Sequence, residues 1–398
     1  MNKIVAMSLS AAVALNAADI NNMFAAGKAE GQIRAAYVNQ DNAVDTDTYG
    51  ASIGGVLKYE TAGWNGVKLG VAAYISQKLS FATGDDERSS GDLFAEESTS
   101  YVYAGEAYID YSTDNFNLRI GRQLIDTPLA DTDNIRMHPN TFEAAIASYS
   151  GIEGMTLVGG YVTRWAGYDS GNDISKFKKL AGEDSDGAAV AGIVHEGIEN
   201  LTVQGWYYSI DRLADAFYAD ATYAFPLGKS IGMELAGQFA SFDEKNNSGL
   251  DGNVYGVGLY LNFGMLTVSA AYNKASNGDG KSVSNGFGGG PYVTSMEEMT
   301  IDGFEDAKAY QLSAEIDMAD AGIDGLVLMA LYGDFKSAPA HMKLQETDLI
   351  AAYTISKTLS AEVSYAMLHD ENENTGDDGF TPYDGGYDRL LVRLDYNF

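Results

Sequence analysis

Segments in which apolar and polar side chains alternate recur along the chain from Gly31 onward. Each is roughly ten residues long, the length of a tilted strand that crosses a membrane. The last of them places five apolar or aromatic side chains on one face: Leu390, Val392, Leu394, Tyr396 and Phe398. A period of two gives a strand one face for lipid and one for water. The pattern therefore predicts membrane-spanning β-strands.

Alternation fails in two stretches, residues 187–198 and 325–335, where both faces are apolar. An apolar face that points into a water-filled barrel needs a cover. Either a contact with another subunit or a loop folded inward would supply it, and the sequence leaves both explanations open.

The connections between these segments are short and long in turn. Eight short ones are predicted at residues 61–66, 113–115, 150–154, 196–200, 226–229, 263–265, 319–325 and 356–358. Nine long polar ones are predicted at residues 40–48, 82–100, 125–140, 168–186, 210–216, 243–252, 275–306, 334–345 and 370–387. Together they join 18 antiparallel strands, an even number with both chain ends on the short-turn side.

The predicted fold class is therefore all-β, a transmembrane antiparallel β-barrel of about 18 strands with short periplasmic turns and long extracellular loops. Composition agrees, because the chain has 45 Gly, 26 Tyr and 16 Phe but only 6 Pro. Tight turns use glycine, strands favour aromatic residues, and proline interrupts the hydrogen-bond ladder. We expect a single barrel domain over residues 19–398.

The first 18 residues predict export. Lys3 precedes an apolar stretch, residues 4–15, which is followed by the small residues Ala17 and Ala18. This order is that of a secretory signal peptide, cleaved after residue 17 or 18. An exported barrel points to the bacterial outer membrane.

The chain carries 56 acidic and 25 basic residues, a formal net charge of −31 that becomes −32 when Lys3 leaves with the signal peptide. Such a charge argues against binding to nucleic acid, which depends on the neutralisation of phosphates. With no Cys there are no thiolate nucleophiles, and the four His have no metal-ligand spacing. No catalytic residues and no cofactor are therefore predicted. The acidic stretches 41–47 and 184–186 would bind Ca²⁺ or Mg²⁺ weakly, although solvated loop charge is the simpler explanation.

The third long connection carries the most distinctive residues. It contains Pro128 and Pro139, which stiffen the loop by fixing φ, and the acidic residues Asp126, Asp131 and Asp133. A barrel of about 16 to 18 strands leaves an open lumen. We expect this stiff acidic loop to fold inward and narrow it.

Four parts of this stretch, residues 121–123, 127–129, 133–136 and 139–143, resemble the constriction loop of the OprD-like porins, particularly their major-outer-membrane-porin branch. The resemblance implies an 18-stranded diffusion channel that assembles as a homotrimer. Some OprD-like porins select basic amino acids or carboxylates, and that selectivity does not follow from this stretch.

The pleat of the predicted strands assigns further charged residues to the lumen. The predicted acidic side of the constriction comprises Asp126, Asp131, Asp133, Glu143, Glu106 and Asp110. The predicted basic wall comprises Arg34, Arg119, Arg122 and Arg393. Loop aspartates that face wall arginines would create a transverse field, which favours polar solutes over apolar ones. Alternatively, these are ordinary lumen charges that satisfy one another.

The leading hypothesis is a general diffusion porin for ions and small hydrophilic solutes, with a mild cation preference set by the net charge. One alternative is a channel that prefers small carboxylates or amino acids. Another is a surface-exposed adhesive or antigenic barrel that uses its long loops, and an enzyme is disfavoured. Expected partners are outer-membrane lipid, lipopolysaccharide and the barrel-assembly machinery, for which the terminal aromatic residues Tyr396 and Phe398 form an assembly signal.

Overall fold

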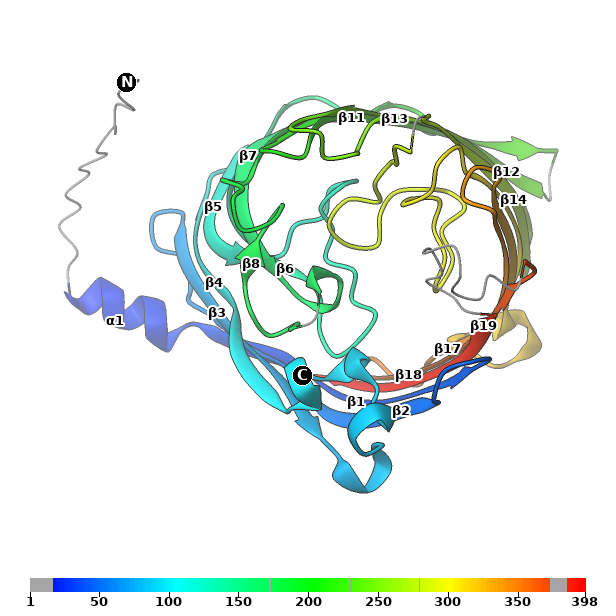
Figure 1. Cartoon of the computed structure of the whole chain (residues 1–398). Helices are drawn as coiled ribbons and strands as arrows, with labels where there is room; N and C mark the ends of the chain where they lie inside the picture. Colours follow the sequence, from blue (N-terminus) through cyan, green and yellow to red (C-terminus); the bar gives the residue numbers. More distant parts are fainter. Residues whose placement is uncertain (1–16, 172, 229–230, 279, 373–384) are drawn as a thin grey trace.

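The computed structural model describes residues 17–171, 173–228, 231–278, 280–372 and 385–398. Its strands form one antiparallel sheet that closes on itself, because β1 pairs with both β2 and β19. Viewed along the axis, the strands surround a lumen that several loops enter (Figure 1). The predicted all-β barrel is confirmed, with 18 strands in the wall of the part described.

The wall strands are β1 Lys28–Asn42, β2 Thr48–Glu60, β3 Val67–Lys78, β4 Tyr101–Ser112, β5 Phe116–Gln123, β6 Thr141–Ile152, β7 Met155–Ala166, β9 Ala188–Ile198, β10 Leu201–Ile210, β11 Ala214–Leu227, β12 Ile231–Glu244, β13 Gly252–Phe263, β14 Leu266–Ser276, β15 Lys308–Asp317, β16 Leu326–Ser337, β17 Met342–Thr354, β18 Leu359–Asp370 and β19 Gly386–Asn397. A two-residue strand, β8 Lys178–Lys179, pairs with β7 from within a loop. The helices are α1 Ala17–Ala25 and the short 3₁₀ turns η1 Ser80–Ala82, η2 Asp86–Arg88, η3 Gly91–Leu93, η4 Glu96–Ser98, η5 Tyr168–Ser170 and η6 Met318–Ala321.

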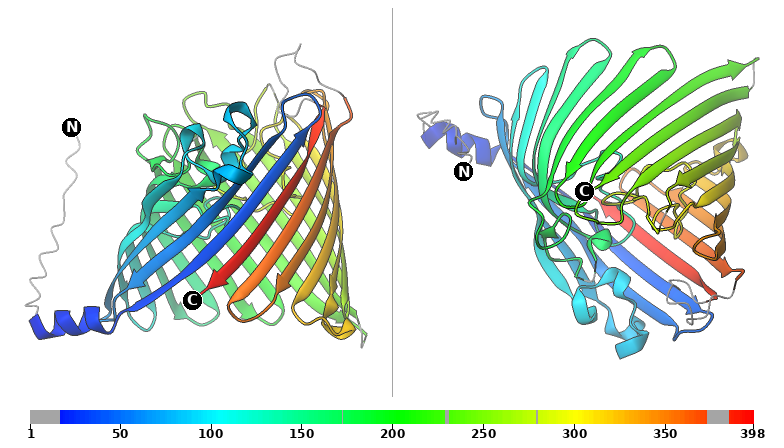
Figure 2. Two further views of the ribbon diagram at one scale, coloured as in Figure 1. Left: turned by 90° about the horizontal axis from the view of Figure 1, so that it is seen from below. Right: turned by 45° about the horizontal axis from the view of Figure 1, so that its top comes forward.

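All eight predicted short turns join neighbouring strands at one end of the barrel, and the longer connections lie at the other (Figure 2). Two connections predicted to be long are in fact short: residues 211–213 between β10 and β11, and residues 338–341 between β16 and β17. The ladders there continue further than alternation suggested, up to the pairs Ile210 with Ala214 and Ser337 with Met342. Residues 373–384 of the last predicted loop lie outside the described residues.

Most of the predicted signal peptide, residues 1–16, also lies outside the described residues. Helix α1 begins at Ala17, so it contains both predicted cleavage positions, and it lies beside the short-turn end of the barrel (Figure 2). The backbone N–H of Ala62 donates to the carbonyl of Met23 over 3.0 Å. Among the described residues, no helix has the length and apolar character needed to span a membrane.

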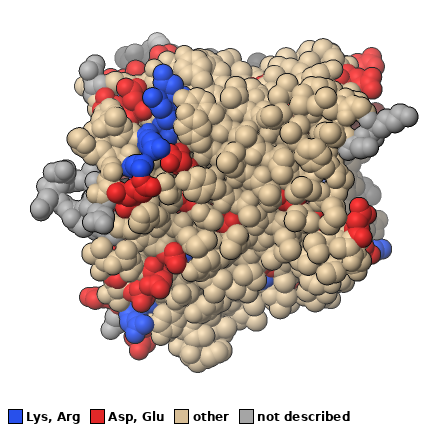
Figure 3. All heavy atoms as spheres, turned by 90° about the vertical axis from the view of Figure 1, so that its right-hand side faces the viewer, with Lys and Arg blue, Asp and Glu red and all other residues tan. Residues whose placement is uncertain are grey.

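The outer surface is that of a barrel in lipid. On the side that carries β12 and β14, the middle of the surface is mostly uncharged (Figure 3). In β19 the predicted apolar row is exposed, with Leu394 at 44%, Tyr396 at 46% and Phe398 at 51%. Arg389 and Leu391, on either side of Leu390, are buried on the inner side. The wall therefore separates an apolar exterior from a polar lumen, as the alternation predicted.

Loops that fold inward fill part of the lumen. The β5–β6 loop (residues 124–140) and the β14–β15 loop (residues 277–307) both lie inside the ring of strands (Figure 1). Side chains of both loops share one buried apolar cluster with inner wall residues, among them Leu129, Met299, Val190 and Phe335. Val190 and Phe335 belong to the two stretches with apolar inner faces, so an inward-folded loop covers the inner face of each.

Candidate functional site

The β5–β6 loop enters the lumen and is held on the wall formed by β1 and β19. Arg34 of β1 makes a bidentate ion pair with Asp395, at 2.6 and 2.8 Å, and donates from Nη1 to Asn134 Oδ1 of the loop over 2.9 Å. Arg393 of β19 donates from Nη1 to the carbonyl of Asn134 over 2.7 Å. The two wall arginines therefore fix the tip of the loop, while their own charges pair with wall carboxylates.

A buried histidine fixes the returning arm of this loop. His138 Nε2 and the hydroxyl of Tyr101 lie 2.6 Å apart, and the rings of Tyr74 and Tyr103 pack at 4.8 and 5.4 Å from the imidazole. Burial lowers the pKa of His138 to about 4, so the ring is neutral at physiological pH. This arm of the loop is a packed aromatic contact rather than a charged surface.

The β14–β15 loop is the second inserted segment, and wall side chains bind its backbone. Gln238 Oε1 accepts from Val293 N over 2.9 Å, and Asn273 Oδ1 accepts from Thr294 N over 3.0 Å. Glu346 is fully buried and accepts from the N–H groups of residues 298 and 299, each over 2.8 Å. Polar wall groups from β12 to β17 thus satisfy backbone N–H groups that would otherwise be unpaired in the lumen.

The two inserted loops pair with each other. Phe287 N donates to the carbonyl of Leu129, and Asp131 N donates to the carbonyl of Phe287, both over 3.0 Å. The Phe287 ring packs edge-on against Trp165 of β7, with 5.4 Å between ring centroids. This contact joins the loops into one bridge inside the barrel.

Four buried or half-buried ionic groups connect this bridge to the wall and to a third loop. They form the ionic cluster: Asp92 of the β3–β4 loop (residues 79–100), Arg136 of the β5–β6 loop, Glu298 of the β14–β15 loop and Arg389 of β19. Arg389 Nη1 lies 2.7 Å from Glu298, and its Nη2 contacts Asp92. Arg136 lies 3.5 Å from Asp92 and 3.8 Å from Glu298. Two cations and two anions therefore balance where three loops meet.

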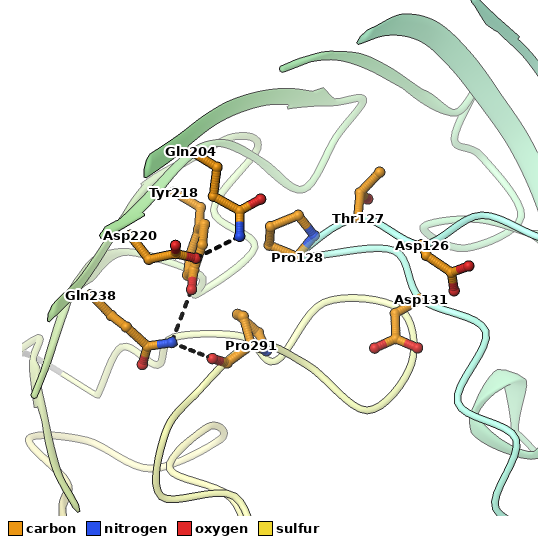
Figure 4. Close-up of a pocket in the computed structure, with 9 residues that line it drawn as sticks. All are labelled: Asp126, Thr127, Pro128, Asp131, Gln204, Tyr218, Asp220, Gln238 and Pro291. Carbon is orange, nitrogen blue, oxygen red and sulfur yellow. Dashed lines mark hydrogen bonds between the residues drawn. The ribbon is translucent and has the colours of Figure 1, made fainter. Parts of the chain in front are cut away.

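Two pockets adjoin this bridge and share Asp131. The first, of about 360 Å³, is lined by Asp126, Thr127, Pro128, Asp131, Gln204, Tyr218, Asp220, Gln238 and Pro291. We call it the proline pocket; wall side chains line one side and loop residues the other (Figure 4). The second, the acidic pocket of about 390 Å³, has five carboxylates in its lining, Asp131, Asp133, Asp169, Glu297 and Glu298. Arg136 is the basic residue in that lining.

The carboxylates of the acidic pocket crowd one another. Burial, and then the charges of Asp169 and Asp131, raise the pKa of Asp133. Burial likewise raises the pKa of Asp169 and of Asp131. These groups bind protons more readily than exposed carboxyls do, and the charge of the pocket therefore depends on pH near neutrality.

Comparison with known proteins agrees with this architecture. The sequence model of a family described as outer membrane porin, OprD family, matches residues 22–383. The chain belongs to the OprD family. The family resemblance drawn from the constriction loop is thereby confirmed, and the protein is an outer-membrane porin. No curated protein matches the chain in sequence.

Solved structures of similar fold include porins of Acinetobacter baumannii, Pseudomonas aeruginosa and Pseudomonas fluorescens. OccAB2 of Acinetobacter baumannii has a TM-score of 0.81 and 17% identity, with 95% of this chain and 99% of that chain covered. OccK9 (OpdG) of Pseudomonas aeruginosa has a TM-score of 0.79 and 18% identity, with the same coverage. A BenF-like porin from Pseudomonas fluorescens has a TM-score of 0.80 and 17% identity, with 94% of this chain and 99% of that chain covered. At these identities the likeness concerns the fold.

In this OprD-family barrel, the three predicted loop aspartates occupy different surroundings. Asp126 shares a further cavity, of about 270 Å³, with Arg119 of the wall. Asp131 lines the proline pocket together with Asp126 and the acidic pocket together with Asp133. The expectation that all three face wall arginines is therefore wrong for Asp131 and Asp133, because the inserted β14–β15 loop and Asp169 lie there. Their role in a constriction stays a prediction.

The other predicted acidic residues lie outside the two pockets and are paired. Glu106 lies 2.9 Å from Lys58, and Asp110 lies 2.9 Å from Arg119. Glu143 lies 3.7 Å from Arg122, and both side chains are more than a third exposed. These pairs agree with the simpler explanation that lumen charges satisfy one another.

The remaining predictions concern loops and metals. Pro128 lines the proline pocket, and the carbonyl of Pro139 lies 3.1 Å from Nδ1 of His138, so both prolines belong to the inserted loop. Tyr396 and Phe398 stack at 6.4 Å on the outer face; their role in assembly stays a prediction. Within the described ranges, no group of three or more His, Asp and Glu side chains is placed to hold a metal ion. Weak binding of Ca²⁺ or Mg²⁺ by the acidic stretches also stays a prediction.

Sequence reasoning missed the inward course of the β14–β15 loop, which it treated as an exposed and adhesive segment. A signal was present, because the loop carries Tyr292, Met299, Ile301 and Phe304, all buried in the structure. Several large apolar residues in a long polar loop indicate that the loop packs against other residues and is not fully exposed to water. The burial of these side chains also weakens the adhesive hypothesis for this loop.

Proposed function

We propose that this OprD-family porin passes ions and small hydrophilic solutes by general diffusion and prefers cations mildly. The observation that carries this proposal is the lining of the acidic pocket, where five carboxylates accompany Arg136 beside the bridge that narrows the lumen. Fixed negative charge in a low-dielectric passage raises the local concentration of cations and lowers that of anions.

The pairing of the wall cations supports the same preference. Arg34, Arg119 and Arg393 each contact a wall carboxylate, namely Asp395, Asp110 and Glu362. Their positive charges are therefore balanced locally. Among the described residues, Asp131, Asp133, Asp169 and Glu297 form no ion pair. The unbalanced charge at the bridge is negative.

Reversal potentials of single channels in a planar bilayer under a salt gradient test this proposal. We expect the wild type to favour K⁺ over Cl⁻, and the Asp131→Asn, Asp133→Asn double variant to lose part of that preference. Asp114→Asn, in the exposed turn between β4 and β5, is a matched control that should behave as wild type. A clear anion preference in the wild type would overturn the proposal, and a folded barrel without conductance would overturn the assignment as an open channel.

A second candidate function is a preference for amino acids over other small solutes, and the proline pocket favours it. Its carboxylates, Asp126, Asp131 and Asp220, would attract an ammonium group, while Pro128 and Pro291 offer an apolar surface. A basic track for small carboxylates along Arg119, Arg122 and Arg393 has less support. These arginines lie on β5 and β19, with four strands between them, and each is already paired with a carboxylate.

Solute uptake separates these possibilities. Proteoliposome swelling should be faster with a zwitterionic or cationic amino acid than with an uncharged sugar of similar mass if the proline pocket selects solutes. Equal rates would support general diffusion alone. Replacement of all three arginines by Ala should leave the uptake of a small dicarboxylate unchanged, and a large loss would restore the basic-track hypothesis.

Assembly belongs to the same proposal. We expect a homotrimer in the outer membrane, folded by the barrel-assembly machinery from a precursor cleaved after residue 17 or 18. The exposed aromatic end of β19, Tyr396 and Phe398, supports recognition by that machinery. Native mass measurement of the purified porin and sequencing of its mature N-terminus test these expectations.

A further inference from the structure

Four lysines stand next to one another across four neighbouring strands. Lys274 of β14 pairs in register with Lys308 of β15, Lys308 pairs with Lys336 of β16, and Lys336 pairs with Lys343 of β17. We call these four residues the lysine row. In a chain with 25 basic and 56 acidic residues, such a continuous run of basic neighbours stands apart from the general charge.

The lysine row faces outward. Along β15, Lys308 lies on the same face as Tyr310 and Leu312, which are 53% and 57% exposed. Ala309 and Gln311, between them, are buried on the lumen side. The same alternation holds in β14, where Asn273 and Ala275 are buried on either side of the exposed Lys274. The lysines therefore point away from the channel.

The row also lies at the level expected for lipid headgroups. Its members are at strand ends on the side of the barrel opposite the eight short turns, which is the extracellular end: Lys274 and Lys308 flank the β14–β15 loop, and Lys336 and Lys343 flank the short connection at residues 338–341. Tyr272 and Tyr310 are each two positions from a lysine of the row, on the side of the membrane centre. Their rings pack together with 4.7 Å between centroids. Tyrosine collects at the boundary between hydrocarbon and headgroups. Two residues along a strand are about 7 Å, so the ammonium groups lie just above that boundary.

Protein carboxylates balance only part of this charge. Lys336 lies 2.7 Å from Asp334, and Lys343 contacts Glu371. Within the described part of the chain, no carboxylate forms an ion pair with Lys274 or Lys308. Like charges placed directly opposite each other on adjacent strands destabilise a sheet. An anion supplied from outside the protein would remove that cost.

We propose that the lysine row binds the phosphate groups of a phosphorylated lipid in the outer leaflet, namely lipopolysaccharide. The ammonium groups of Lys274 and Lys308 form charge-assisted hydrogen bonds with phosphate oxygens, and Lys336 and Lys343 extend the positive surface. The acyl chains of the same lipid lie against the apolar side chains below, such as Leu312. In the space-filling view, basic side chains form a short column near one end of this face, with acidic side chains beside it, and the middle of the face is mostly uncharged (Figure 3).

Lipid binding to the purified porin tests this proposal. The probe is diphosphoryl lipid A in a neutral detergent, measured by native mass spectrometry or by titration. A lysine near a lipid phosphate contributes about 1 kcal/mol, so the Lys274→Gln, Lys308→Gln double variant should bind roughly 25-fold more weakly. The Lys28→Gln, Lys357→Gln double variant removes the same charge at the periplasmic rim and should bind as wild type.

A second probe identifies the chemical group that is recognised. Lipid A without phosphates should bind to the wild type as weakly as diphosphoryl lipid A binds to the Lys274→Gln, Lys308→Gln variant. Equal binding of phosphorylated and phosphate-free lipid, or unchanged binding by the lysine-row variant, would overturn the proposal. Heat-modifiable migration on gels verifies that each variant is a folded barrel. Because the measurement does not involve conductance, its failure would leave the proposed channel function untouched.

Discussion

The β5–β6 loop and the β14–β15 loop both enter the lumen, yet their sequences differ in kind. The first contains Pro128 and Pro139, which stiffen it, and its residues resemble the constriction loop of OprD-like porins. The second contains many glycines, including Gly288 and Gly290, whose φ values are +132° and +77°. Glycine adopts positive φ without steric cost, so the backbone of this loop can bend sharply at these positions. The sequence of the loop therefore does not by itself fix its course.

Side chains of the barrel wall fix the course of the β14–β15 loop. The half-buried Gln238 of β12 and the buried Asn273, Gln311 and Glu346 of β14, β15 and β17 point inward and bind the loop backbone. The first loop needs fewer such anchors, because two arginines hold its tip and an aromatic cluster holds its returning arm. A stiff loop is recognisable in its own sequence, whereas a flexible loop is placed by residues far away in the chain.

Removal of Arg389 should have the largest effect, because this residue holds Glu298 of the β14–β15 loop and Asp92 of the β3–β4 loop in the ionic cluster. The Arg389→Ala variant leaves Glu298 and Asp92 with Arg136 as their remaining partner in the ionic cluster. Breaking a buried ion pair by deleting one partner costs about 3–5 kcal/mol. Urea unfolding monitored by tryptophan fluorescence should show a loss of that size.

An exposed pair provides the control for this variant. Arg122 and Glu143 lie 3.7 Å apart, with side chains 36% and 40% exposed. Such pairs contribute about 0–1 kcal/mol, so Arg122→Ala should unfold close to wild type. Equal destabilisation by the two substitutions would show that the ionic cluster does not connect the loops energetically.

Glu346→Ala distinguishes the contribution of the β14–β15 loop from that of the β5–β6 loop, because it removes contacts of the β14–β15 loop only. The N–H groups of residues 298 and 299, the first half-buried and the second buried, lose their acceptor, and a buried unsatisfied group costs about 1–3 kcal/mol. We expect reduced stability, with larger current fluctuations in single channels as this loop loosens. Thr347→Ala, one residue further on the outward face, is the matched control. Quiet, wild-type currents from Glu346→Ala would mean that the loop does not border the ion path.

Asn134→Ala tests the tip of the β5–β6 loop and should have a smaller effect. The substitution removes one charge-assisted hydrogen bond, from Arg34 over 2.9 Å, worth about 1.5–3 kcal/mol. The contact of Arg393 with the backbone carbonyl of residue 134 is retained. Unfolding measurements should therefore show a modest loss, and a loss as large as that of Arg389→Ala would contradict a loop that is held at several points.

The pH dependence of ion preference is the smallest expected effect. Because burial raises the pKa of Asp133 and Asp169, both lose charge before ordinary carboxyls do as the pH falls. One charge at a distance of about 10 Å in water changes the energy of an ion by about 0.4 kcal/mol, or roughly twofold in concentration. The ratio of K⁺ to Cl⁻ permeability should therefore begin to fall near neutral pH.

The Asp133→Asn, Asp169→Asn double variant should show a smaller step, because Glu298, whose pKa burial raises to about 7, still titrates in the same pocket. The same raised pKa values mean that the folded state binds these protons more tightly than the unfolded state, so this contribution to stability grows as the pH falls through them. A wild-type permeability ratio that stays constant down to the pH at which exposed carboxyls titrate would contradict the assignment of Asp133 and Asp169 to the ion path.

Local pattern made much of the fold predictable. Alternation identified the two faces of β19, and glycine and polar residues marked all eight short turns, because strand period and turn chemistry depend on neighbouring residues. The site was predictable only in part. Asp126 and Arg119 line one cavity. The residues near Asp133 in the sequence, however, do not predict that Asp169 and the β14–β15 loop are its neighbours in space.

The sequence by itself determined a closed, acidic, membrane-spanning barrel with a stiff loop turned inward. Each of these properties can be recognised from composition or from residues that are close together in the chain. Tertiary structure alone decided where charge is balanced and where it is not. Arg34 and Asp395 are 361 positions apart along the chain, and Asp92 and Arg389 are also distant in sequence, yet each pair is in contact. Closure of the sheet brings such groups together, and the pairing of wall cations leaves the negative charge unbalanced at the bridge.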